Sequence, residues 1–259
     1  MERPGKVFLV GAGPGDPELL TLKALRVLQV AEAIVYDRLA SAEVLALAPK
    51  GALMFGVGKA AQYHPFPQPE IHRLLIGLAR KGRTVVRLKG GDPFIFGRGG
   101  EEALALAQAG IPFEVIPGIT AAQACAASAG VPLTHRGIAN SVRFLTGHGQ
   151  SDAQLNYDWQ GLANPGTTLA LYMGLQTIPA IAGGLIAHGR SPDTPAMAIS
   201  HAATSAERRL TSTLGQIASA VAGAGFEPPT LFIIGEVVSL PITPGRSCDA
   251  MAPHLVAAE

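Results

Sequence analysis

Short apolar runs alternate with amphipathic stretches through the first half of the chain. The apolar runs predict β-strands at residues 6–10, 33–36, 53–57, 84–88 and 113–116. The amphipathic stretches predict helices at 17–30, 70–81 and 101–109, and an alanine-rich run predicts another that ends at Ala129. Asp16 and Pro17 have the residue types favoured at the start of a helix. Strands that alternate with helices indicate a mainly parallel sheet covered on both faces.

The pattern breaks at residues 130–137, which include Pro132, and then starts again. Strands are expected at 142–146, 168–172, 195–200 and 231–235, an edge strand at 208–213, and helices at 178–188 and 215–223. The prediction is an α/β protein of two domains, residues 1–134 and 135–241, with mainly parallel or mixed sheets flanked by helices. Residues 242–259 lack periodicity, so we expect a poorly ordered tail.

Composition narrows the class of protein. The chain has 259 residues, of which 48% are hydrophobic, enough for two modest domains with sizeable cores. A net charge of +1 gives no overall field for nucleic acid, so no nucleic-acid partner is expected. Cys125 and Cys248 have no metal-binding spacing, and no metal site is expected. No apolar run is long enough to cross a membrane and the N-terminus is unlike a signal peptide, which predicts a cytoplasmic protein without a membrane partner.

A glycine-rich loop at residues 11–16 (GAGPGD) follows the first strand. Such a loop before a helix suits anions, and Asp37 after the second strand would mimic a ribose-binding acid, so a dinucleotide-dependent oxidoreductase is one interpretation. Two details weaken it: Asp16 stands where the motif has its third glycine, and Pro14 lacks a backbone donor. Taken alone, the loop is equally consistent with a turn in which Asp16 caps the helix.

Several further segments resemble the tetrapyrrole methylase family. In chain order, the matching segments are VGAGPGDPELLTLKA, YDRL, GK, RLKGGDPFIFGRGGEE, PGITAA, PLTHRG, TGH, LYMG and IIGEVV, which together span nearly the whole chain. One such segment would be weak, but their joint order and spacing are specific. The resemblance implies the class III methyltransferase fold, an active site in the cleft between the two domains, and a homodimer.

The same resemblance implies a reaction. S-adenosyl-L-methionine is expected as the methyl donor and S-adenosyl-L-homocysteine as its product. The acceptor is expected to be uroporphyrinogen III, an anionic tetrapyrrole methylated twice to precorrin-2 for siroheme, cobalamin or heme d1 biosynthesis. Another precorrin methyltransferase is a near alternative. An oxidoreductase and a non-catalytic tetrapyrrole-binding protein are alternatives from other classes.

Site residues follow from their positions in the matched segments. The chemistry needs alignment of the donor with a pyrrole carbon and a positioned base for the leaving proton. The resemblance makes Asp37 and Lys59 the expected proton acceptor and donor, and Glu101 a catalytic base or the group that orients a catalytic Arg98. The planar fork of arginine suits carboxylates. The expected substrate-binding residues are Arg38, Arg98, Arg136 and Met173.

The segment at residues 87–102 would join the donor and acceptor sites. By the same resemblance, its first part faces the methyl donor, while Arg98 and Glu101 face the acceptor. Ala203 stands where many relatives have glycine. The full set of expected donor contacts is Pro14, Gly90, Gly91, Asp92, Ile95, Thr120, Ala121, Met173 and Ala203.

Overall fold

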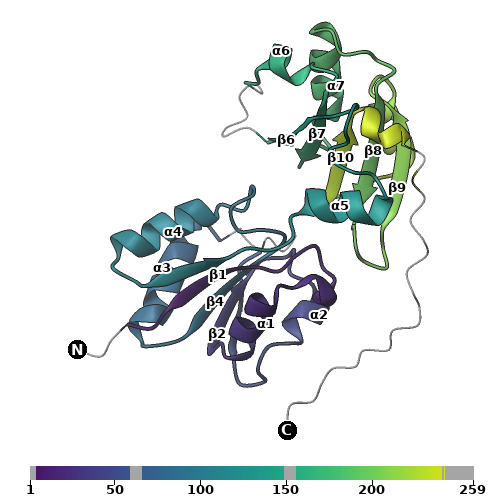
Figure 1. The fold of residues 1–259 in the computed structure, drawn as a ribbon. Helices are drawn as coiled ribbons and strands as arrows, with labels where there is room; N and C mark the ends of the chain where they lie inside the picture. The colour runs from purple at the N-terminus through teal and green to yellow at the C-terminus, as the bar shows by residue number, and fades with distance from the viewer. Residues whose placement is uncertain (1–3, 59–65, 149–155, 241, 243–259) are drawn as a thin grey trace.

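The first half of the chain folds around a parallel sheet. The computed structural model describes residues 4–58, 66–148, 156–240 and 242. The sheet has five strands in the order β3-β2-β4-β1-β5, all paired in parallel (Figure 1). Its strands are β1 (Val7–Gly11), β2 (Ala33–Tyr36), β3 (Leu53–Gly56), β4 (Val85–Lys89) and β5 (Phe113–Ile116).

Helices cover both faces of this first sheet. On one face, α1 (Leu22–Gln29) and α2 (Ala42–Leu45) bury Leu28 and Val44 against β1, β2 and β4. On the other face, α3 (Gln68–Arg80) and α4 (Gly99–Gln108) bury Leu75 and Leu106 in a separate core (Figure 1). The central strands β1, β2 and β4 are buried on both faces, which explains why they read as continuous apolar runs, whereas Leu53 and Met54 of the edge strand β3 are exposed.

The second half forms a mixed sheet in the order β6-β7-β10-β8-β9. Only β6 and β7 pair in parallel; the other neighbours are antiparallel. Three helices, α6 (Trp159–Leu162), α7 (Ile178–Ala187) and α8 (Ile217–Gly223), pack on one face. The strands are β6 (Ser141–Thr146), β7 (Thr167–Tyr172), β8 (Pro195–Ser200), β9 (Arg208–Thr213) and β10 (Thr230–Ile234). The expected architecture of two α/β sheets flanked by helices is thus confirmed.

Helix α5 (Ala121–Ala129) covers the other face of the second sheet, together with the 3₁₀ turn Glu236–Ser239. Its buried Ala122, Cys125 and Ala126 share a core with Ile199 and Ile233. The helix precedes residue 134, where the sequence pattern breaks, yet it packs with the elements that follow. Gly130 ends it in the left-handed conformation, with φ 68°.

The structure corrects the expected helix at residues 17–30. A 3₁₀ turn at Pro17–Leu19, capped by Asp16, is separated from α1 by Leu20, whose ψ of 143° is extended. Thr21 then caps α1 by accepting a hydrogen bond from the Ala24 N–H at 3.1 Å. A second local cap therefore outcompetes helix continuation. The short helices α2 and α6 were not expected.

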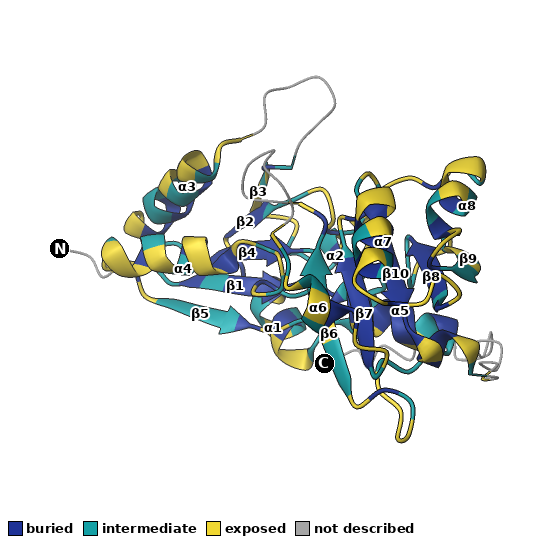
Figure 2. Cartoon of the chain, turned by 90° about the horizontal axis from the view of Figure 1, so that it is seen from above, coloured by how far each residue is buried: buried dark blue, intermediate teal, exposed yellow. Residues whose placement is uncertain are grey.

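Burial follows the same layers. Central strands are buried and the outer faces of the helices are exposed (Figure 2). Among the helices within the described ranges, none is both long and apolar enough to cross a membrane. The tail expected at 242–259 lies, apart from Ile242, outside the described residues.

Candidate functional site

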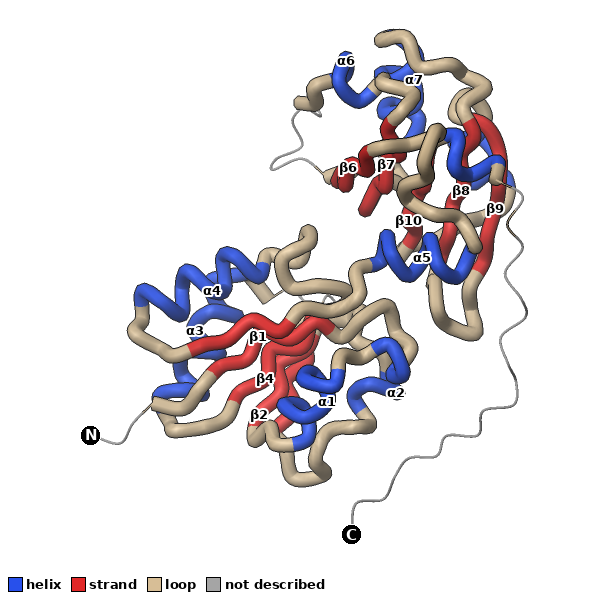
Figure 3. Tube along the Cα trace, in the orientation of Figure 1, coloured by secondary structure: helices blue, strands red, loops and turns tan. Residues whose placement is uncertain are grey.

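Loops gather where the first sheet faces helix α5 (Figure 3). The chain leaves β1 toward β2 over one face and leaves β4 toward β5 over the other, so the order reverses between β1 and β4. In open α/β sheets this switch point, at the carboxyl ends of the strands, is the usual ligand position. The loops that follow β1 and β4 carry most of the residues expected to contact the methyl donor.

Backbone hydrogen bonds join these two loops directly. The Ala12 N–H donates to the Lys89 carbonyl at 2.7 Å, and the Gly13 N–H donates to the Gly91 carbonyl at 3.2 Å. The Gly91 N–H returns a bond to the Gly13 carbonyl at 2.7 Å. Pro14 has no N–H. The amides at residues 12–14 are therefore not free to cradle a pyrophosphate, which argues against a dinucleotide site.

Asp92 ties the loop after β4 to the loop after β5. One carboxylate oxygen accepts from the Phe94 N–H at 2.8 Å and the other from the Gly118 N–H at 3.0 Å. A side chain at Gly118 would collide with the Gly91 carbonyl, and one at Gly90 would meet Leu39 Cβ at 2.5 Å. These loops approach so closely that no side chain fits at either glycine, which leaves a glycine-rich rim.

Non-glycine residues with positive φ cluster among the expected site residues and their close neighbours. They are Phe96 (φ 50°), Arg98 (59°), Met173 (53°), His201 (51°) and Ala203 (58°). Such conformations are costly and persist where surrounding structure holds them, often at ligand sites. Phe96 and Met173 are also exposed, at 39% and 44%. We call the region where the loops after β1, β4 and β5 face α5 and the second sheet the junction. Positive φ and exposed apolar side chains occur on both sides of it.

Side chains from the second half of the chain reach this junction. The Tyr172 hydroxyl lies 2.6 Å from Thr120 Oγ1 and accepts from the Ala122 N–H at 3.0 Å. Its ring lies 5.0 Å from that of Phe96. A Cβ added at Gly15 would sit 3.1 Å from Thr204 Cγ2. Burial raises the pKa of the Tyr172 hydroxyl, and Thr120 partly opposes that shift.

Arg98 and Glu101 form a two-point ion pair at the start of α4. Arg98 Nε and Nη2 donate to the two Glu101 oxygens at 2.9 and 2.8 Å. This contact raises the pKa of Arg98 and lowers that of Glu101. Both side chains are exposed, so the guanidinium presents its remaining donors to solvent. The pairing fits Glu101 as the group that orients Arg98.

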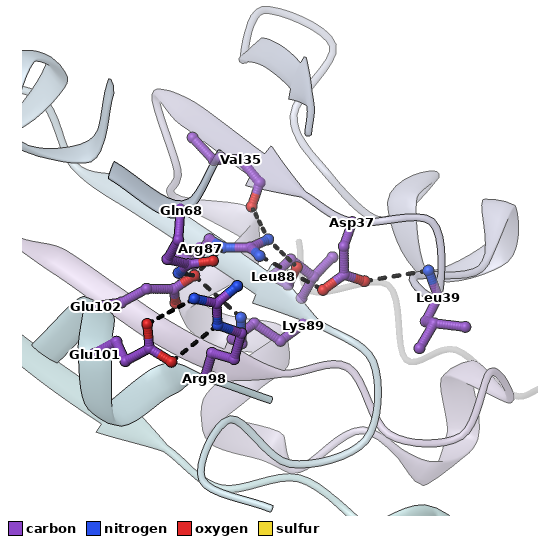
Figure 4. Close-up of polar contacts among 10 residues, drawn as sticks. All are labelled: Val35, Asp37, Leu39, Gln68, Arg87, Leu88, Lys89, Arg98, Glu101 and Glu102. Carbon is purple, nitrogen blue, oxygen red and sulfur yellow. Dashed lines mark hydrogen bonds and ion pairs between the residues drawn. The ribbon is translucent and has the colours of Figure 1, made fainter. Parts of the chain in front are cut away.

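A buried charged cluster lies beside this pair (Figure 4). Glu102 Oε1 accepts from Arg87 Nε at 3.0 Å, from Lys89 Nζ at 3.1 Å and from Gln68 Nε2 at 3.1 Å. Arg87 Nη2 lies 3.6 Å from Asp37 Oδ2. Glu102 is 0% exposed, and Arg87 and Lys89 are each 3% exposed. Burial lowers the pKa of Lys89, as does the neighbouring Arg87 charge, while Glu102 opposes the shift.

The sequence prediction of the site missed this cluster. A signal was present, because β4 reads VVRLK and charges inside a central parallel strand need partners. On the adjacent strand of the same sheet, Asp37 follows β2, and its Oδ1 accepts from the Leu39 N–H at 3.1 Å. The structure therefore brings Asp37, Arg98 and Glu101 into one neighbourhood with three residues that had no expected role.

Other expected residues are less closely connected. Arg38 and Arg136 are exposed, and none of the described contacts joins them to the cluster. Lys59 lies outside the described residues; Gly58 before it is close enough that a Cβ would meet the Arg38 nitrogen at 2.5 Å. The Ala203 N–H donates to Glu207 at 2.8 Å. A hollow of about 550 Å³ lies by Gly137 and Leu240, and no expected site residue lines it.

Known proteins share this chain's sequence and fold. A family model described as Tetrapyrrole (Corrin/Porphyrin) Methylases matches residues 6–218. Uroporphyrinogen-III C-methyltransferase of Paracoccus denitrificans is 55% identical over 236 residues, which cover 91% of this chain and 82% of that protein. Siroheme synthase of Methylococcus capsulatus is 54% identical over 241 residues, covering 92% of this chain and 51% of the relative.

A solved structure of a methyltransferase also matches this chain in fold and sequence. The crystal structure of uroporphyrin-III C-methyl transferase from Thermus thermophilus, complexed with S-adenyl homocysteine, matches with a TM-score of 0.77 and 44% identity. The match covers 91% of this chain and 94% of that one. Against the siroheme synthase, the chain spans about half of the relative's length, 51%. Neither these relatives nor the bonded glycine loop supports the oxidoreductase interpretation.

Proposed function

Because the chain belongs to the tetrapyrrole (corrin/porphyrin) methylase family, we propose that it methylates uroporphyrinogen III at two carbons. S-adenosyl-L-methionine is the methyl donor and S-adenosyl-L-homocysteine the by-product. The observation that carries the proposal is the arrangement of loops and exposed side chains at the junction. A glycine-rich rim formed by the loops after β1, β4 and β5 lies near the exposed Phe96, Arg98 and Met173, whose backbones have positive φ.

The residues at this junction fit the methyl donor. At Gly91 a Cβ would meet no atom closer than 3.7 Å, so the absence of a side chain there leaves room for a ligand, and half-exposed Met173 offers an apolar contact. The donor, when bound, supplies a methyl group already activated as a sulfonium. The residues proposed to hold it are Pro14, Gly90, Gly91, Asp92, Ile95, Thr120, Ala121, Met173 and Ala203.

The acceptor needs positive charge and orientation. The exposed Arg98 guanidinium, held at two points by Glu101, would bind a substrate carboxylate with its free donors, and Arg38 and Arg136 would bind others. Met173 would contact the ring system. Holding a pyrrole carbon in line with the transferring methyl is mainly an orientation effect.

Each methylated pyrrole must then lose a proton. Asp37 would accept it, since its carboxylate follows β2 and lies beside the buried Arg87, with the Arg98–Glu101 pair on the other side of the charged cluster (Figure 4). Lys59 would donate a proton during the rearrangement, and a second proton would then leave the macrocycle, so that each methylation releases one proton in net. A residue that accepts a proton must lie within hydrogen-bond reach of it in the complex, which makes the position of Asp37 the sensitive quantity.

The biological setting is part of the proposal. The product of the proposed reaction, precorrin-2, would be used in siroheme, cobalamin or heme d1 synthesis. The similarity to siroheme synthases supports siroheme synthesis. The proposal includes a homodimer, which the family resemblance implies, and a cytoplasmic location, which the sequence pattern predicts. Light scattering of the purified protein would test the dimer.

One assay tests the reaction. Purified protein is incubated without oxygen with uroporphyrinogen III and S-adenosyl-L-methionine labelled in its methyl group. The expected result is label in the tetrapyrrole, with two methyl groups per molecule by mass spectrometry. Bound donor without labelled tetrapyrrole would refute the proposed substrate and favour another precorrin methyltransferase, and a single methylation would refute the second transfer. Tetrapyrrole binding without donor binding would support a non-catalytic binding protein.

A further inference from the structure

We propose that Arg87 and Glu102 are positioning residues, which fix the Asp37 carboxylate in the orientation that its proton transfer requires. The inference rests on the proposed function, because it explains how Asp37 would be held in place for its proposed role as proton acceptor. Neither side chain reaches solvent: Arg87 is 3% exposed and Glu102 is 0% exposed. They act on the reaction only through Asp37, which is 26% exposed.

Arg87 is immobilised on several sides. Its Nη1 donates to the Val35 carbonyl at 3.3 Å and to the Leu88 carbonyl at 3.1 Å, while Nε donates to Glu102. The remaining Nη2 faces Asp37 Oδ2 at 3.6 Å. A guanidinium is rigid and planar, so bonds at Nε and Nη1 determine where Nη2 lies.

Asp37 is therefore held from both sides. The Leu39 N–H binds Oδ1 at 3.1 Å, and Arg87 Nη2 lies near Oδ2. Together the two contacts define the plane of the carboxylate and leave its other lone pairs for a substrate proton. The backbone contact alone would permit rotation about the bond that carries the carboxylate.

Glu102 is the anchor of Arg87. Its Oε1 takes three donors, from Arg87, Lys89 and Gln68, while Oε2 has no partner in the described part of the chain. A buried carboxylate that leaves one oxygen unpaired is costly. Stability alone would favour sharing the donors between both oxygens. Concentrating them on one oxygen instead sets the position of Arg87.

The charges in the cluster also balance. Arg87 and Lys89 supply two cations, and Glu102 and Asp37 supply two carboxylates. Removing the Glu102 charge would leave two buried cations competing for Asp37, so the guanidinium would shift toward it or turn away. Either movement would change the direction of the Asp37 lone pairs. Because proton transfer depends on the orientation of the base, this change would slow the reaction.

A double-mutant cycle tests the inference. The variants are Arg87→Lys and Asp37→Asn, singly and together, in the complete protein. Lysine keeps the charge but cannot reach all the partners of the guanidinium at once. In Arg87→Lys we expect kcat to fall about 10- to 100-fold with an unchanged KM for uroporphyrinogen III and unchanged S-adenosyl-L-homocysteine affinity. In the Asp37→Asn background the same change should have no further effect on kcat.

A second variant and a control complete the design. Glu102→Gln should lower kcat when Asp37 is present and have no further effect in the Asp37→Asn background. Glu114→Gln, which alters an ion cluster on β5, should leave kcat unchanged. Equal losses with and without Asp37 would overturn the positioning role, as would failure of both cluster variants to fold, which would make the cluster a folding element. Full activity in Asp37→Asn would instead refute the role proposed for Asp37 itself.

Discussion

At the scale of single residues, Arg98 makes the sharpest distinction between donor and acceptor binding. Its backbone is left-handed, with φ 59°, and its ion pair with Glu101 holds an exposed guanidinium at the start of α4. We expect Arg98→Ala to abolish turnover because a carboxylate anchor is lost, and to leave S-adenosyl-L-homocysteine affinity nearly unchanged. Steady-state kinetics and calorimetric titration measure the two quantities.

The matched control for this prediction is Arg26→Ala. Arg26 is also an exposed arginine, on α1, and its Nε donates to the Leu22 carbonyl. It should alter neither turnover nor binding. If Arg98→Ala lost donor binding in parallel with turnover, Arg98 would belong to the donor site rather than the acceptor site.

The same scale shows how far sequence reasoning reached. Asp37, Arg98 and Glu101 were expected in one site, and the structure places them together; their roles stay predictions. Arg87 and Glu102 were missed because nothing in their own segments says which charges meet. That depends on β2, β4, α3 and α4 packing side by side, with 52 residues separating Arg87 from the Val35 carbonyl it binds.

At the scale of elements, an exposed ion cluster ties β1, β5 and α1 together. Glu114 on β5 pairs with Lys6 at 2.6 Å and with Lys23. The two lysines lower the pKa of Glu114 to about 2. A carboxyl whose pKa is lower in the folded state stabilises the fold above its ordinary pKa and loses that contribution as the pH falls toward 2.

Glu114→Gln should therefore lower the unfolding midpoint at neutral pH and converge with the wild type near the acid end of this window. Since the cluster is exposed, the effect should be small and should shrink in about 1 M salt, where charges are screened within about 3 Å. Thermal unfolding followed by circular dichroism at several pH values measures it. A difference that persisted at low pH and high salt would show that packing, and not charge, is responsible.

Helix α5 provides a second element-scale test. Burial raises the pKa of the Cys125 thiol to about 12, because α5 packs into the core of the second sheet. In a Cys248→Ser background, Cys125 should resist a thiol reagent until α5 detaches from that sheet. Labelling followed by absorbance, in native buffer and in denaturant, measures this protection.

Gln123→Cys, in a chain whose own two cysteines are replaced by serine, is the control, since Gln123 is exposed on the same helix. It should react at once. Rapid labelling of Cys125 in native buffer would mean that α5 is not held by the second sheet. Protection would lead us to propose that the domain boundary lies in the loop before α5 rather than at residues 134 and 135, as expected from the sequence.

The elements also show which sequence signals are decisive. Apolar runs located the strands well, because strands buried on both faces leave a continuous pattern. Helix ends were harder. The expected helix at 17–30 is split at Leu20, since Asp16 and Thr21 are both good caps and the second begins α1. The sequence shows both candidates, but the choice between one long helix and two short ones depends on packing.

At the scale of the whole molecule, Tyr172 joins the two halves. Its ring packs near Phe96, and its hydroxyl bonds Thr120 Oγ1 and the Ala122 N–H at the start of α5. Thr120 is also an expected donor contact. The order of parallel strands indicated where a site should form, but this pairing of distant segments, 52 residues apart, was not expected from the sequence.

Tyr172→Phe should consequently change donor binding as well as stability. Losing the hydroxyl leaves the Ala122 N–H without its hydrogen-bond acceptor, which should lower the free energy of unfolding by about 1–3 kcal/mol. It should also weaken S-adenosyl-L-homocysteine binding, because the loop of Thr120 loses its anchor on the second sheet. Tyr157→Phe is the matched control, since that hydroxyl donates to the Thr146 carbonyl at 2.5 Å within the second half alone. It should lower stability and leave donor affinity intact. Equal effects of the two variants on affinity would mean that general softening, and not the contact between the halves, governs donor binding.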